Sequence, residues 1–149
     1  MRKRYLYWLI VFLYILFIFS NSFQTGEASG NMSAILTVFI NRIIKIDFDN
    51  LHHIIRKLAH FIEYFILAIL VIFANNKAPL FNNKFTTIFL FMVLVPLIDE
   101  FIQLFIDGRA GTLIDCIIDI AGYALYTLIY LLINRKKVDY DKWFSKRNI

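Results

Sequence analysis

The sequence predicts an all-α fold: a polytopic membrane protein built as a four-helix transmembrane bundle with one extra amphipathic interfacial helix. Hydrophobic residues make up 60% of the 149 residues, whereas a soluble domain contains roughly 45–50%. They gather in four runs, each close to the roughly 20 residues that a transmembrane helix needs. A chain of this length forms one domain at most, so we expect a single membrane domain over residues 1–149.

The first predicted span, residues 5–23, follows the basic start Arg2-Lys3-Arg4. A charged start and an apolar stretch are also typical of a signal peptide. No clear small-residue cleavage site follows, and the apolar run has the length of a full span. We therefore expect a first span that is not cleaved, followed by a polar loop over residues 24–30.

Residues 32–46 have the two-faced pattern of a surface helix. Apolar residues recur at helical spacing from Ile35 to Ile44, while polar residues such as Arg42 and Lys45 lie opposite them. The segment is too short and too two-faced to cross a bilayer, so we expect an amphipathic helix at the membrane interface.

The remaining spans are predicted at residues 55–74, 85–106 and 112–133. A turn-rich loop joins the first two, and the tight connection 107–111 joins the last two. Four spans place both termini on one side of the membrane. Eleven of the sixteen lysines and arginines lie on that side, which the positive-inside rule assigns to the cytoplasm.

The net charge of +5 lies mostly at span ends. We therefore interpret it as a signal of topology and expect the partner to be the lipid bilayer, with no nucleic acid. The single cysteine, Cys116, permits no internal disulfide and lies in an apolar segment, where it is typical of a small buried residue.

Three of the spans carry their polar groups in one shallow layer. Counting about 1.5 Å per residue from the outer membrane surface places these groups about 5–12 Å deep. The opposite halves of the same spans carry no charge. An ionisable group in hydrocarbon costs about 2.5–3.5 kcal/mol, so such groups must be paired, solvated or used. We expect them to line a polar cleft that is open to the outside.

Helical spacing also orients these groups. The pairs that share a helix face are His60 with Glu63 and Tyr64, Asp99 with Gln103, and Asp115 with Asp119. Gly122 extends the last of these faces and permits close helix approach. Pro96 cannot donate a backbone hydrogen bond, so we expect a kink in the third span.

The residues in this layer resemble the VanZ-like family of small bacterial integral membrane proteins. The matching pieces are Arg56–Tyr64 (RKLAHFIEY), Asp99–Phe105 (DEFIQLF), Gly108-Arg109, Asp115, Asp119 and Gly122. The family commonly has proline before Gly-Arg, where this chain has Asp107. The resemblance implies a protein of the bacterial cytoplasmic membrane. It also implies a link to glycopeptide resistance of the teicoplanin type, but it supplies no settled biochemical activity.

Our leading hypothesis is that the cleft recognises the headgroup of a lipid or lipid-linked envelope molecule. Phosphate or amide groups would contact Arg109, Lys57 and His60. The other expected ligand-binding residues are Tyr64, Gln103, Asp115 and Asp119. An alternative is that Arg109 pairs with Asp107 or Asp115 and only fixes the turn. Asp115 and Asp119 repel each other when both are ionised, so at least one needs a cation, a donor or a proton.

Two other classes of function remain open. The cleft could be a membrane-embedded transferase or hydrolase acting on envelope lipids, with His60, Glu63, Asp99 and Glu100 as candidate catalytic residues. His60 and Glu63, joined by a carboxylate of another helix, could also hold zinc or manganese, or form a simple hydrogen-bonded pair. The third class is a small proton- or ion-coupled transport component. The sequence does not decide whether a metal or cofactor binds.

Overall fold

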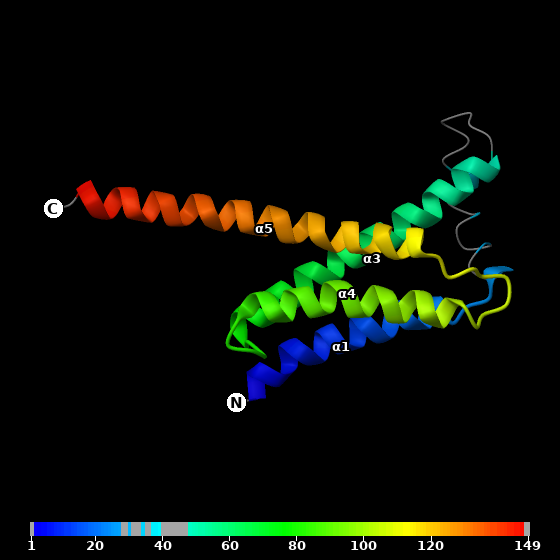
Figure 1. Ribbon diagram of the computed structural model, residues 1–149, viewed down its shortest axis with the longest axis horizontal. Helices are drawn as coiled ribbons and strands as arrows, with labels where there is room; N and C mark the ends of the chain where they lie inside the picture. Colours follow the sequence, from blue (N-terminus) through cyan, green and yellow to red (C-terminus); the bar gives the residue numbers. More distant parts are fainter. Residues whose placement is uncertain (1, 28–29, 31–33, 35–36, 40–47, 148–149) are drawn as a thin grey trace.

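The computed structural model describes residues 2–27, 30, 34, 37–39 and 48–147, and this part of the chain is helical with no β-strand. Its long helices are α1 (Arg2–Ser22), α3 (Phe48–Lys77), α4 (Lys84–Gln103) and α5 (Leu113–Arg147), shown in Figure 1. Each contains a stretch that is long and apolar enough to cross a membrane. The predicted all-α fold with four spans is confirmed. The interfacial helix predicted over residues 32–46 falls largely outside the described residues.

The helices run alternately up and down. In Figure 1 the N-terminus and the connection between α3 and α4 lie at one end of the bundle. The end of α1, the beginning of α3 and the connection between α4 and α5 lie at the opposite end. The residues predicted to share a polar layer belong to this second end, which we call the site end.

Three helix bounds differ clearly from the predicted spans. The helix α3 begins at Phe48, well before the predicted start at residue 55. The helix α4 ends at Gln103 and not at residue 106, because the chain then turns through backbone hydrogen bonds such as Ile106 N to Gln103 O at 3.3 Å. The helix α5 continues to Arg147, well past the predicted end at 133. Its extension contains neither glycine nor proline, so nothing in it breaks a helix. The helix α4 also remains helical through Pro96, which is buried.

The core lies between the four helices and consists of apolar side chains with two buried tyrosines. Its most buried members are Ile18, Tyr64, Leu67, Ala68, Val71 and Tyr123. Many large apolar side chains point outward instead, as expected when the surrounding solvent is lipid.

The helices α3 and α5 form the most extensive pair. A Cβ atom at Gly122 would overlap the backbone carbonyl of Phe61. The close approach predicted from this glycine is therefore present, and it brings the polar faces of α3 and α5 together.

Candidate functional site

The loop after α1 docks on the connection between α4 and α5. The backbone N–H of Gly26 donates to the carbonyl of Asp107 at 3.0 Å. A Cβ atom at Gly26 would overlap the carbonyl oxygen of Gly108, and Gly108 itself has φ +72°. Glycine adopts this left-handed conformation without steric cost. The two glycines thus allow two backbones to meet at the site end.

Arg109 ties these two segments together. Its Nε donates to the carbonyl of Gln24 at 2.9 Å, and its Nη2 donates to the carbonyl of Asn21 at 2.8 Å. Burial and the nearby Arg56 lower the pKa of Arg109, but a guanidinium stays charged in proteins. The ion pairs within 4 Å among the described residues do not include Arg109, so the alternative pairing with Asp107 or Asp115 is not formed.

The carboxylate of Glu100 holds the connection between α4 and α5 against α4 through hydrogen bonds. One carboxylate oxygen accepts from the backbone N–H of Thr112 at 2.8 Å, and the other accepts from Gln103 Nε2 at 3.2 Å. A Cβ atom at Gly111 would overlap the backbone carbonyl of Glu100. The connection is therefore packed directly on α4, and the carboxylate of Glu100 is already well supplied with donors.

Asp115 belongs to the N-terminal cap of α5. The backbone N–H of Asp115 donates to Thr112 Oγ1 at 3.1 Å, and the Thr112 hydroxyl donates to Asp115 Oδ2 at 2.9 Å. Lys57 Nζ of α3 lies 3.8 Å from Asp115 Oδ1. At least one of Asp115 and Asp119 was expected to need a cation, a donor or a proton, and Asp115 has both a donor and a cation. Asp119 has neither Thr112 nor Lys57 as a partner.

Glu63 turns toward α1. Its Oε1 accepts from Asn21 Nδ2 at 2.9 Å, and its backbone carbonyl accepts from the Tyr14 hydroxyl at 3.2 Å. His60, one turn earlier on the same helix, faces Asp119 instead, with Nδ1 3.6 Å from Oδ1. The two residues therefore share the site end but have partners on different helices.

The centre of the site end is a cluster that we call the buried trio, formed by His60, Asp99 and Asp119. One potential ligand atom from each residue lies within 4.8 Å of the other two. Asp99 and Asp119 are 0% exposed. Asp99 Oδ1 accepts from the hydroxyl of Ser22. Among the described residues, Asp99 Oδ2 and both oxygens of Asp119 have no hydrogen-bond partner.

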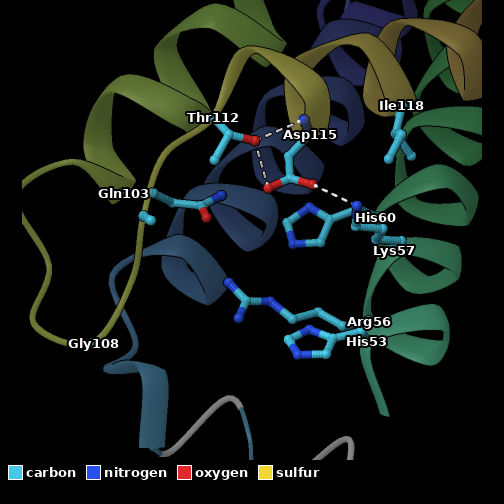
Figure 2. Close-up of a pocket in the computed structure, with 10 residues that line it drawn as sticks. His53, Arg56, Lys57, His60, Gln103, Gly108, Thr112, Asp115 and Ile118 are labelled. Carbon is cyan, nitrogen blue, oxygen red and sulfur yellow. Dashed lines mark hydrogen bonds and ion pairs between the residues drawn. The ribbon is translucent and has the colours of Figure 1, made fainter. Parts of the chain in front are cut away.

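A pocket of about 270 Å³ opens next to the trio, between α3, α5 and the preceding connection (Figure 2). It is lined by His53, Arg56, Lys57, His60, Gln103, Gly108, Ala110, Thr112, Asp115 and Ile118. Figure 2 shows that His53, Arg56 and Lys57 all project from α3 toward this space. The pocket therefore has a basic wall on α3, and Asp115 lies opposite it.

The predicted site residues fall into three groups by position. Those that line the pocket are Lys57, His60, Gln103 and Asp115. Those buried beside it are Tyr64, Asp99 and Asp119. Those engaged in ties between helices or loops are Glu63, Glu100 and Arg109.

Arg56 lines the pocket but is not among the predicted site residues, and the same is true of His53. The available signal was the spacing of His53, Arg56 and Lys57, which places all three on one helix face.

The helices and the buried polar groups define a multi-pass membrane protein with a charged chamber at one end of its bundle. The model of the VanZ/LLP1 family matches residues 5–134, and the chain belongs to this family. No curated protein and no solved structure matches the chain. The resemblance seen in the sequence motifs is thus confirmed.

Proposed function

We propose that the protein recognises the phosphate-bearing headgroup of a lipid or lipid-linked envelope molecule in the pocket between α3 and α5. The observation that carries this proposal is the basic wall of the pocket. His53, Arg56 and Lys57 line one side of a space of about 270 Å³. A volume of this order accommodates a headgroup, since small-ligand pockets begin near 300 Å³.

The charges of the wall support an anionic ligand. Lys57 is half exposed, and its ion pair with Asp115 is loose at 3.8 Å. Exposed pairs of this kind contribute about 0–1 kcal/mol, so an incoming phosphate can replace Asp115 at little cost. Arg56 adds a planar guanidinium, which matches the geometry of phosphate oxygens.

The surroundings support an amphipathic ligand in particular. On α3 the exposed apolar residues Ile54 and Leu58 flank the basic residues, with 58% and 54% of their surface exposed. On α5 the corresponding residues are Ile114 and Ile117, with 63% and 64% exposed. A ligand with its headgroup in the pocket can therefore lay its hydrocarbon chain along either helix.

Two other predicted residues, Arg109 and Glu100, hold the segments around the pocket in place. Arg109 holds the loop after α1, and Glu100 holds the connection that forms one side of the pocket. In this proposal the site end faces outward and both termini are cytoplasmic, in a bacterial cytoplasmic membrane. Binding of an envelope headgroup there would alter how a teicoplanin-type antibiotic meets its target.

The test measures binding of a fluorescent short-chain phosphatidylglycerol to the full chain in neutral detergent micelles. The variants are Lys57→Gln and Arg56→Gln, and Arg135→Gln on α5 is the matched control. A basic residue near an anionic lipid contributes about 1 kcal/mol, which corresponds to about fivefold in affinity. We expect each pocket variant to weaken binding by about this factor and the control to bind like the original chain.

Competition identifies the source of the phosphate. Displacement by an unlabelled polyprenyl phosphate at lower concentration than phosphatidylglycerol assigns the site to lipid-linked precursors, and the reverse order assigns it to membrane phospholipid. Equal binding of phosphatidylcholine and phosphatidylglycerol, or equal affinity in all three variants, would refute the proposal.

A second candidate, a hydrolase or transferase acting on the same lipids, is favoured by the position of His60. This residue lines the pocket and also lies 3.6 Å from the buried Asp119. An imidazole next to a carboxylate can act as a general base. Mass spectrometry of polyprenyl phosphates and phospholipids after incubation with the protein tests this candidate. Turnover that disappears in His60→Gln would support it, and unchanged lipid would exclude it for these substrates.

A further inference from the structure

We propose that the buried trio of His60, Asp99 and Asp119 binds one divalent transition-metal ion, with Zn²⁺ as the preferred ion. This site lies beside the headgroup pocket and is distinct from its basic wall. The proposal does not depend on lipid recognition, because it shares only His60 with the lining of the pocket and rests on different contacts.

The spacing of the trio suits a metal ion. Ligand atoms from three different helices lie within 4.8 Å of one another, and His60 Nδ1 and Asp119 Oδ1 are 3.6 Å apart. Zinc binds imidazole nitrogen and carboxylate oxygen at about 2.0–2.2 Å, which separates tetrahedral ligands by about 3.4 Å. The observed distance is too long for a good hydrogen bond but close to the separation of two ligands on one ion.

Charge balance also favours a cation. Asp99 and Asp119 are both fully buried, and isolated buried carboxylates are too costly to keep ionised without compensation. In the described part of the chain, the only ion-pair contact of either carboxylate within 4 Å is the one to His60. Two carboxylates, one neutral imidazole and one divalent ion have no net charge, so a metal ion removes the cost.

The hydrogen bonding of the trio leaves atoms available for a ligand. Within the described residues, His60 Nδ1, Asp99 Oδ2 and both carboxylate oxygens of Asp119 are buried without a hydrogen-bond partner. Buried polar atoms are rarely left in this state, and each case calls for an explanation. A metal ion coordinated by one atom from each residue would satisfy three of them at once.

Neighbouring hydroxyl groups fit the role of outer-shell partners. Ser22 donates to Asp99 Oδ1, which fixes the carboxylate and leaves Oδ2 for a metal. The Tyr64 hydroxyl is fully buried next to Asp99 and interacts with its carboxylate, although the two groups do not reach strict hydrogen-bond geometry. Groups that orient metal-binding carboxylates in this way are a regular part of metal sites.

The ligand types select the class of metal. One imidazole and two carboxylates suit zinc, and they also suit manganese, which prefers more oxygen ligands. Zinc binds such sites more tightly than manganese in the usual affinity order of divalent metals. Three protein ligands leave one tetrahedral position for water or a ligand. Because His60 also lines the pocket, this position is near the space proposed for the headgroup.

The experiment measures the metal content of the full chain, purified without a histidine tag and without chelators, by plasma mass spectrometry. We expect about one zinc per chain. The variants Asp119→Asn and His60→Gln should weaken zinc binding at least about tenfold, as expected when a metal site is disrupted. The matched controls Asp115→Asn and Glu63→Gln alter a carboxylate on the same two helices outside the trio, and they should keep the metal.

A second measurement keeps the test valid where a variant misfolds. Chelation of the original chain should lower its thermal unfolding midpoint by about 5–11 °C, since a ligand at 100 times its dissociation constant stabilises by about 2.7 kcal/mol. Added Zn²⁺ should restore the midpoint, and Mg²⁺ should not.

Three results would overturn the proposal. The first is a chain that contains no metal and gains no stability from Zn²⁺ or Mn²⁺, which would mean that the trio is neutralised by protons. The second is a folded Asp119→Asn variant that binds zinc as tightly as the original chain. The third is equal loss of metal in Asp115→Asn and Asp119→Asn, which would place the metal elsewhere.

Discussion

Replacing Arg109 distinguishes a structural tie from a ligand contact. Arg109→Gln removes the two hydrogen bonds to the carbonyls of Asn21 and Gln24. A hydrogen bond with a charged partner contributes about 1.5–3 kcal/mol. The side chain is only half-buried, so we take the lower value for each bond and expect a loss of about 3 kcal/mol in the free energy of unfolding.

Arg109→Lys refines this prediction. Lysine keeps the positive charge but lacks the planar fork that reaches two carbonyls at once. We expect it to restore one of the two bonds, so that about 1.5 kcal/mol remains lost.

Both Arg109 variants can be compared by unfolding in mixed detergent micelles, followed by tryptophan fluorescence. Trp8 is a suitable reporter because it packs near Phe91 and donates to the carbonyl of Ala78 at 2.7 Å. A loss of less than about 0.5 kcal/mol in the free energy of unfolding, together with weaker binding of phosphatidylglycerol, would refute the structural role of Arg109. It would support the earlier hypothesis that Arg109 contacts the headgroup.

Two further predictions use the same unfolding assay. Gly122→Ala should lower the free energy of unfolding by about 1–3 kcal/mol because its Cβ would overlap the carbonyl of Phe61. The control is Ala121→Ser, at an exposed neighbour, which should change stability by less than about 0.5 kcal/mol. Equal effects of the two substitutions would contradict the close contact. Ser22→Ala should cost about 1–3 kcal/mol because Asp99 loses its donor inside the bundle, and a neutral result would mean that this hydroxyl contributes nothing to stability.

The fold could be predicted because lipid exposure keeps most of each span apolar. The ends of the helices could be predicted less well. Phe105 and Ile106 continue the apolar run of α4, but they lie in a turn because the chain must reverse there. At the end of α5 the opposite occurs, since polar residues end the span while the helix continues to Arg147.

Much of the composition of the site end, though not His53 or Arg56, could be predicted from depth and helical spacing. The partners could not, because many of them are backbone groups. Arg109 donates to the carbonyl of Asn21 at the end of α1 and to that of Gln24 in the loop that follows, both more than 80 residues earlier in the chain. Glu100 accepts from the backbone N–H of Thr112. Every residue has such groups, so the sequence contains no signal for them. The sequence likewise does not show that Asp115 has hydrogen-bond partners while Asp119 has none among the described residues.

The central claim is that the basic wall lines a pocket that opens on the outside of the cell and receives an anionic headgroup. Lys57→Cys places a thiol in this wall, while the native Cys116 is buried. A membrane-impermeant maleimide should label this variant in intact cells, and added short-chain phosphatidylglycerol should slow the labelling. The control Lys77→Cys, at the opposite end of α3, should react only after permeabilisation. Labelling of Lys57→Cys only in permeabilised cells, or at a rate that the lipid does not change, would contradict the account.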